Sequence, residues 1–426
     1  METAARLDAK VATQSLRLRW WYITIPLVAM GLVNMMDRTA IGVVMANKQF
    51  LQDLNLVGRQ AVTGLLMSGF LVTYGLSPIV WGYVMKWVGP RILAITGIII
   101  WGITMALSGA AQTAGALITA RVILGIGEGF TFPVFNVFVA NWFLAKERGR
   151  ANSLWLSGLN LGPVIAGVLV AAVVAASGWR VAFFTLSAIS FLIPLPLVIF
   201  LMRDRPDQHP RISRDEVRLI DEGRQAKTAQ AAKAEANRSY LANHRFWLIA
   251  VAWGFCNIYF WGWATWMPTY FRTVRNFSFQ TAGYLYSLNY LFTLVAILGF
   301  GYLADRFMRR ALFGGVMPII GGVLMFLGGS VLGNPYWSVA ALVFGLACQQ
   351  VGFLMVHPLL QSIVPAASLS RAVGFATLVS YLMAMVSPTF AGFLLQISGF
   401  GAVIVYLALS SVLPGVLILS LTREGY

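Results

Sequence analysis

Long apolar tracts separated by short polar breaks run along almost the whole chain. Charge-free tracts cover residues 92–120, 151–178, 181–202, 276–304, 311–370 and 372–422. A helix needs about 20 apolar residues to cross the hydrocarbon core of a bilayer, and several of these tracts are long enough for two crossings. The polar breaks divide the chain into twelve predicted spans, at 20–45, 61–85, 91–111, 115–142, 151–176, 181–202, 246–271, 281–304, 311–332, 336–363, 371–396 and 400–421. The pattern therefore predicts an all-α membrane protein with twelve transmembrane helices.

The longest polar segment, residues 203–245, separates six predicted spans from six. The segment "GYVMKWVGPR" at 82–91 follows the second span, and the similar "GYLADRFMRR" at 301–310 follows the eighth. Two parallel repeats of six helices are the layout of one large class of transporters. We predict an N-terminal bundle at 1–202, a cytoplasmic linker at 203–245 and a C-terminal bundle at 246–426. The amphipathic stretch "RISRDEVRLIDEGRQAK" predicts a short surface helix within the linker.

Composition and charge fit this interpretation. The chain has 426 residues, of which 58% are hydrophobic and 11% are charged, whereas soluble domains carry about 25% charged residues. Most of the Lys and Arg residues behind the net charge of +16 fall on one side of the predicted spans, and the exceptions outside the spans are Lys48, Arg59, Arg180, Arg272 and Arg275. Basic loops mark the cytoplasmic side, so both termini are expected in the cytoplasm.

The basic N-terminal tail leads into a long apolar run without a small-residue cleavage site, so it is interpreted as part of a transmembrane helix rather than a signal peptide. The positive charge is a topology signal and gives an affinity for anionic lipid; no nucleic-acid partner is expected. Cys256 and Cys348 lie in apolar surroundings without metal-binding spacing, so neither a disulfide framework, a metal nor a cofactor is predicted.

Four charged residues lie inside the predicted spans, away from the span ends: Asp37, Arg38, Arg121 and Glu128. Each costs about 2.5–3.5 kcal/mol at the centre of a membrane helix on the insertion scale. Arg121 and Glu128 are seven residues apart and share one helix face. Gly125, Gly127 and Gly129 leave room on that helix for another helix, water or a ligand. One interpretation is structural: two acids and two bases pair and hold the first and fourth helices together.

The other interpretation is functional. An arginine in a low-dielectric site binds carboxylates and phosphates through its planar fork of N–H donors. A carboxylate in such a site tends to hold a proton, and a nearby arginine opposes that tendency until it is occupied by another anion. Two acids and two arginines can therefore exchange partners among a proton, a substrate and each other. This is the chemistry of a proton-coupled carrier of a small organic anion.

Several segments resemble the major facilitator superfamily, and more narrowly its anion:cation symporter family. "DRTAIG" resembles the first-helix motif, and "RVILGIGEGFTFP" followed by "NWFLAKERGRANSLWLSG" resembles the fourth helix, the next loop and the fifth helix. "TWMPTYF" is similar to the seventh-helix signature and "GYLADRFMRR" to the loop motif after the eighth helix. The resemblance implies two six-helix bundles, transport by alternating access, a monomer, and a place in the bacterial inner membrane.

The resemblance also implies roles for single residues. It implies that Arg38 and Arg121 meet the carboxylate of the substrate and that Asp37 and Glu128 handle the proton. Further substrate-binding candidates are Tyr74, Asn160, Asn289, Ser380 and Tyr381, and the loop motif of the second half contributes Gly301, Asp305 and Arg306.

The chain also departs from the family pattern. Lys86 and Trp87 replace the Asp and Arg of the loop motif in the first half. Ser380 and Tyr381 stand where sugar-acid carriers often have Asn, which leaves an aromatic acid open as the cargo. The altered loop also leaves open a nutrient sensor that binds without transporting. The intramembrane arginines disfavour cationic drugs as cargo, and no enzyme motif is present. His357 is interpreted as a packing residue beside Pro358, with a proton relay as the alternative.

Overall fold

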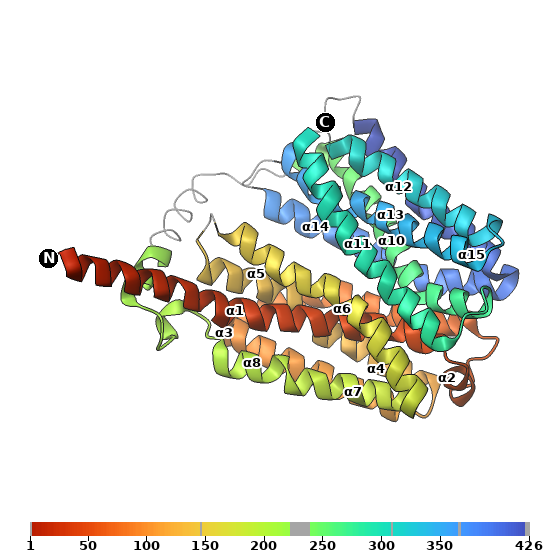
Figure 1. Cartoon of the computed structure of the whole chain (residues 1–426), viewed down its shortest axis with the longest axis horizontal. Helices are drawn as coiled ribbons and strands as arrows, with labels where there is room; N and C mark the ends of the chain where they lie inside the picture. Colours follow the sequence, from red (N-terminus) through yellow and green to blue (C-terminus); the bar gives the residue numbers. More distant parts are fainter. Residues whose placement is uncertain (1, 145–146, 222–238, 308–309, 365–367, 422–426) are drawn as a thin grey trace.

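The computed structural model describes residues 2–144, 147–221, 239–307, 310–364 and 368–421, and these residues form helices without any strand. Figure 1 shows two bundles lying side by side. The helices of the first bundle are α1 (Glu2–Met45), α2 (Lys48–Asp53), α3 (Gln60–Ala110), α4 (Ala114–Glu128), α5 (Thr131–Trp142), α6 (Arg148–Ser177), α7 (Trp179–Leu192) and α8 (Pro194–Leu201). The helices of the second bundle are α10 (His244–Thr273), α11 (Phe279–Phe307), α12 (Arg310–Phe326), the short η3 (Leu327–Val331), α13 (Pro335–Ile363), α14 (Leu369–Ala384) and α15 (Ser387–Ser420).

Among the described residues, 10 helical segments are long and apolar enough to cross a membrane. Two of these segments each contain two predicted spans. In each case a single residue with non-helical backbone angles, Gly89 in α3 or Gly399 in α15, joins two helices at a sharp kink. Both glycines have positive φ angles, of 80° and 75°, a conformation that glycine adopts without the steric penalty of a Cβ atom. The twelve predicted spans are therefore present, but the loops expected near 86–90 and 397–399 are sharp kinks.

Three predicted spans contain breaks that the sequence pattern did not indicate. The span at 371–396 is divided into α14 and α15 at Met385 and Val386. The span at 115–142 is divided into α4 and α5 at Gly129 and Phe130, immediately after Glu128. The span at 181–202 is divided into α7 and α8 before Pro194, whose ring cannot continue the helical hydrogen-bond ladder. The break after Glu128 matters most, because it places the end of a helix beside a buried carboxylate.

Close helix contacts within the first bundle depend on small residues. A Cβ atom on Gly158 would collide with the carbonyl oxygen of Val28, and one on Gly162 would meet that of Leu32 at 2.5 Å. The small-xxx-small pattern of Gly158 and Gly162 in α6 therefore packs directly on the backbone of α1. This contact fixes α1, which carries Asp37 and Arg38, against the bundle.

The beginning of the linker also packs on the first bundle. Asp204 Oδ1 accepts a hydrogen bond from the backbone N–H of Arg91 at 2.7 Å, just after the kink at Gly89. Residues 214–221 are helical, as predicted for the amphipathic stretch, and their Glu216 pairs with the buried Arg19 of α1 at 3.1 Å. Arg19 also pairs with Glu147 at 2.7 Å. The rest of the predicted surface helix, from residue 222, lies outside the described residues.

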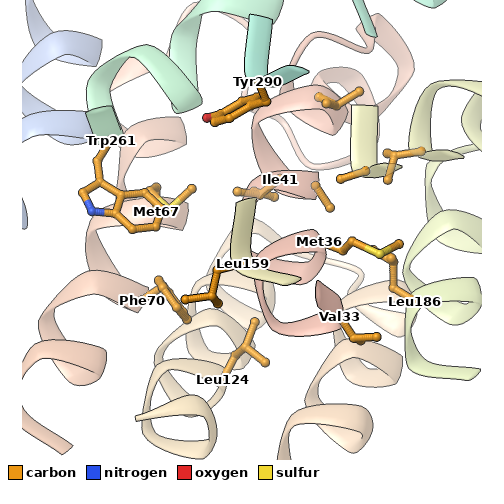
Figure 2. Packing of buried hydrophobic residues seen from close by; sticks show 14 of the residues in the cluster. Val33, Met36, Ile41, Met67, Phe70, Leu124, Leu159, Leu186, Trp261 and Tyr290 are labelled. Carbon is orange, nitrogen blue, oxygen red and sulfur yellow. The ribbon is translucent and has the colours of Figure 1, made fainter. Parts of the chain in front are cut away.

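A single apolar cluster extends across both bundles. Figure 2 shows part of it, with Met36 and Ile41 from α1, Phe70 from α3, and Trp261 and Tyr290 from α10 and α11. All five side chains are buried. The two bundles thus share this cluster, while a second apolar cluster, which includes Phe246 and Leu360, belongs to the second bundle. The charged residues of α1 and α4 lie close to the shared cluster.

Contacts between the bundles gather at the end of the molecule that carries α2, away from the chain termini (Figure 1). Here Arg272 donates a hydrogen bond to the carbonyl oxygen of Ala46, at the end of α1. The backbone N–H of Thr389 donates to Ser68 Oγ at 3.2 Å. Nearby, Gly42 of α1 lies directly on the backbone of α10, where an added Cβ atom would collide with the carbonyl oxygen of Ala264.

We predict that Gly42→Val destabilises this arrangement, because backbone atoms of α10 cannot move aside as a flexible side chain could. Overpacking of this kind costs about 1–3 kcal/mol. The measurement is thermal unfolding of the purified protein, with a lower melting temperature expected for Gly42→Val than for Gly115→Val. Gly115 is a suitable control because a Cβ atom there meets nothing within 4 Å. Equal melting temperatures for the two variants would contradict the close packing of the bundles.

Candidate functional site

The four charged residues predicted inside the spans lie at the centre of the first bundle. Asp37, Arg38, Arg121 and Glu128 are each fully buried, with a relative exposure of 0%. Arg38 Nε donates to Glu128 Oε2 at 2.7 Å, which makes an ion pair between α1 and α4. None of the four side chains faces outward, and all of them come from the two helices that the sequence indicated.

Arg121 is held in a different way. Its Nε donates to the carbonyl oxygen of Leu66 at 3.1 Å, and its Nη1 donates to the carbonyl oxygen of Asp37 at 3.3 Å. The side chain of Asp37 instead accepts a hydrogen bond from Ser190 Oγ at 3.4 Å. Of the two ion pairs considered from the sequence, the structure therefore contains Arg38–Glu128, while Arg121 is bound by neutral main-chain carbonyl groups.

Several polar atoms of this cluster have no hydrogen-bond partner among the described residues. They are Arg38 Nη1 and Nη2, Arg121 Nη2, Asp37 Oδ1 and Glu128 Oε1. Buried polar groups in proteins nearly always have partners, so such a concentration of unpaired atoms needs a specific reason. The arginine nitrogens are donors suited to an oxyanion, and the carboxylate oxygens are acceptors suited to a proton.

Aromatic rings cover the arginines from α3. The guanidinium of Arg38 lies 3.9 Å from the centroid of the Tyr74 ring and 5.6 Å from that of Phe70. The guanidinium of Arg121 lies 5.1 Å from the same Phe70 ring. Cations over aromatic faces are attracted by the ring quadrupole, so α3 stabilises both charges without neutralising them.

The glycines of α4 explain how α3 comes so close. A Cβ atom on Gly125 would collide with the carbonyl oxygen of Phe70, and one on Gly129 would collide with the side chain of Ser77. The sequence left open whether another helix, water or a ligand uses the room beside Glu128. At Gly125 and Gly129 the structure shows that α3 occupies it.

The second-half candidates lie at varying distances from the arginines. The Tyr381 ring packs against Tyr74, with 5.4 Å between the centroids, so it reaches the site across the bundle interface. Its neighbour Ser380 is buried and accepts a hydrogen bond from Asn257 at 3.4 Å. Asn289 is fully buried, donates to the Leu285 carbonyl in its own helix, and leaves its Oδ1 atom without a partner in the described part of the chain.

The structure does not bring the other candidates to the cluster. Asn160 is partly exposed and donates to the Leu156 carbonyl of its own helix. Arg306 is exposed at the end of α11. Gly301 and Asp305 belong to the same helix, and their surroundings lie outside what the structure describes. His357 packs edge-on against Trp253, with 4.9 Å between the rings.

Sequence reasoning missed three groups that hold the cluster: the Phe70 ring, the Leu66 carbonyl and Ser190. Phe70 stands four residues before Tyr74, so helical spacing alone could have placed both rings on one face of α3. Ser190 and the Leu66 carbonyl carry no comparable signal, because a lone serine in an apolar helix usually bonds its own backbone. A carbonyl that accepts a hydrogen bond from another helix is invisible in the sequence.

Two six-span helical bundles, the first of which holds a buried cluster of charges, form the architecture of a class of secondary transporters. The family model described as Major Facilitator Superfamily matches residues 27–388. The chain therefore belongs to the major facilitator superfamily.

Three similar proteins are named as transporters of organic anions. A probable sulfoacetate transporter, SauU, of Cupriavidus necator is 33% identical over 62% of this chain and 60% of its own length. A probable L-galactonate transporter of Escherichia coli is 25% identical, over 68% of this chain and 61% of its own length. The hexuronate transporter of the same species is 27% identical, over 77% of this chain and 76% of its own length. The chain thus spans less than two thirds of the length of the first two relatives.

Solved structures agree on the fold. A bacterial homologue of the human lysosomal transporter Spinster, in an inward-facing and unoccupied conformation, superposes with a TM-score of 0.74 at 18% identity, covering 96% of each chain. A D-xylose-proton symporter gives the same TM-score at 18% identity, covering 93% of this chain and 97% of its own. At this level of identity the likeness concerns the fold alone.

We predict that Glu128→Ala is strongly destabilising, because it leaves the Arg38 guanidinium buried without its carboxylate. Breaking a buried pair in this way costs about 3–5 kcal/mol. The double variant Arg38→Met with Glu128→Leu removes both charges and should recover most of the lost stability. Thermal unfolding measures both effects, with Asp207→Ala, at an exposed linker carboxylate, as the control. A single variant as stable as this control would contradict the buried pair.

Proposed function

We propose that this protein is a proton-coupled symporter that carries a small organic anion by alternating access. One observation carries the proposal: Arg38 binds Glu128 through Nε alone, while both of its terminal nitrogens are buried and unpaired. A purely structural pair in a membrane would satisfy the guanidinium more completely, because unpaired donors are costly there. An arginine with one edge occupied and the other edge free is suited to receive a second anion.

The proposed cycle begins with the carboxylate of the substrate binding to the free nitrogens of Arg38 and to Arg121 Nη2. The incoming negative charge competes with Glu128 for Arg38 and weakens their ion pair. Glu128 then takes up a proton, which restores the charge balance of the buried site. Once the charge of the bound substrate is balanced by the proton, the two bundles can close around the substrate and open toward the other side of the membrane.

Asp37 is proposed as the second proton-handling acid. Its Oδ1 atom is unpaired and its Oδ2 atom accepts a long hydrogen bond of 3.4 Å from Ser190. Its own carbonyl oxygen receives Arg121 Nη1. Protonation of Asp37 would therefore alter the surroundings of Arg121 without breaking a direct ion pair, so we assign the main coupling to Glu128 and a supporting role to Asp37.

The topology follows from the distribution of basic residues. With both termini in the cytoplasm of a bacterial cell, the bundle contacts around Ala46, Gly42 and Thr389 lie on the periplasmic side of the inner membrane. The structure then corresponds to a state that is closed toward the periplasm. A monomer is sufficient for this mechanism, because the proposed site lies mostly within one bundle and is completed by the other through Tyr381.

The substrate is proposed to be a small carboxylic acid. The relatives are named as a probable sulfoacetate transporter, a probable L-galactonate transporter and a hexuronate transporter. These three acids share a carboxylate group and differ in the rest of the molecule. The Tyr74 ring lies against Arg38, and the Tyr381 ring packs on Tyr74, an arrangement that also suits an aromatic acid. The sensor alternative retains one supporting observation, the loop motif altered at Lys86 and Trp87; a sensor would bind such acids without any flux.

The first test is Glu128→Gln in proteoliposomes with an imposed pH gradient. Removing the titratable group should abolish uphill accumulation of the substrate, whereas exchange of labelled for unlabelled substrate should continue at a reduced rate. Asp207→Asn serves as the matched control, since it makes the same chemical change on an exposed carboxylate. If Glu128→Gln concentrates the substrate as well as the control does, Glu128 does not couple the proton.

The second test is Arg38→Lys, which keeps the charge but replaces the planar fork with a point charge. Binding through two terminal nitrogens should be lost, and we expect saturable uptake to fall at least about tenfold, equivalent to the loss of one charged hydrogen bond. Arg59→Lys, at an exposed position between α2 and α3, is the control. Native uptake by Arg38→Lys would show that the fork is not the anion receptor.

A further inference from the structure

The Phe70 ring occupies an unusual position between the two buried arginines. It is fully buried, and the guanidiniums of Arg38 and Arg121 lie 5.6 Å and 5.1 Å from its centroid. The ring is also stacked on that of Tyr74, with 5.4 Å between centroids and 14° between planes. Through Tyr74, which lies 3.9 Å from Arg38, the same stack covers Arg38 a second time.

The backbone around Phe70 is fixed by the contacts of α3 with α4. The carbonyl of Leu66, one turn before Phe70, accepts the hydrogen bond from Arg121 Nε. The carbonyl of Phe70 itself lies so close to Gly125 that no Cβ atom fits between them. Thr73 Oγ1 adds a hydrogen bond of 2.8 Å to the carbonyl of Val122 in α4. The ring therefore has a rigid support, and its position relative to Arg121 and Glu128 is set by the main chain.

Two guanidiniums close to one ring would repel each other, and only one of them is paired with a carboxylate in this cluster. A carboxylate at position 70 would neutralise them and remove their attraction for a substrate. An aliphatic side chain would fill the space without holding either charge. An aromatic face attracts a cation by about 0.5–2 kcal/mol, depending on how far it is desolvated, and leaves its charge available to an incoming anion.

We propose that Phe70 is a positioning residue of the anion site, holding Arg38 and Arg121 oriented toward the substrate through the negative face of its ring. The inference rests on the proposed function and adds to it a residue that makes no hydrogen bond to the cargo. Its effect is preorganisation: guanidiniums already held in the binding orientation lose less freedom when the anion arrives. The stacked Tyr74 ring extends the same support toward Arg38.

The test replaces Phe70 with mono-, di- and trifluorinated phenylalanine. Fluorine withdraws density from the ring face and weakens its attraction for a cation stepwise, while the size and shape of the side chain change little. The probe is whichever of sulfoacetate, L-galactonate, D-glucuronate and benzoate the native protein binds most tightly, measured as Kd by calorimetry. We expect the logarithm of Kd to rise steadily with the number of fluorine atoms, reaching about a tenfold loss with three.

The matched control is the same series at Phe138, which is fully buried in α5 and has no guanidinium over its ring among the described contacts. Fluorination at Phe138 should leave the Kd of the acid probe unchanged. A flat series at Phe70, with binding by the native protein intact, would overturn the positioning role and leave the proposed function standing. If the native protein binds none of the four acids, the proposed carrier of small carboxylates fails instead, so the two failures are distinguishable.

Discussion

Burying ionised groups inside a membrane protein is the constraint on which the rest of this structure depends. A guanidinium or carboxylate that leaves water needs compensation from charges, hydrogen bonds or aromatic faces. Arg38 receives it from Glu128 and from the Tyr74 ring, and Arg121 receives it from two main-chain carbonyl groups and from Phe70. In both cases the compensation is incomplete. The atoms that remain unpaired are the chemical basis of the proposed binding site.

The helix packing supplies the geometry for this partial compensation. Glycines in α4 bring the backbone of α3 close enough for its carbonyl groups and rings to reach the arginines. Glycines in α6 fix α1 against the bundle, which holds Arg38 at the height of Glu128. The break between α4 and α5 follows Glu128 directly. In the proposed cycle, a change of partner at Arg38 acts on the helix that ends at Glu128, and so connects the site to movement of the bundles.

The sequence predicted the architecture well because long apolar tracts and isolated charges within them are strong indicators of membrane helices and buried sites. Apolar length located the spans, and the four buried charges were identifiable because each stands alone in a tract where charge is expensive. The sequence did not predict the kinks at Gly89 and Gly399, because polar residues near a glycine are also typical of a loop. The sequence also did not predict which of the four charged residues pair. Whether Arg121 binds a carboxylate or a carbonyl depends on where Leu66 lies in three dimensions. The sequence could not show that Asn160 would bond its own helix while Tyr381 crosses the interface to Tyr74.

The central claim is that an organic anion replaces Glu128 at Arg38 while a proton replaces Arg38 at Glu128. Infrared difference spectroscopy of the reconstituted protein tests it directly, because a carboxylic acid and a carboxylate absorb at different frequencies. On addition of a bound substrate, the account predicts the appearance of a protonated carboxyl band that shifts in deuterated water and is missing in Glu128→Gln. A spectrum in which substrate binds while Glu128 keeps the same protonation state throughout would contradict the account.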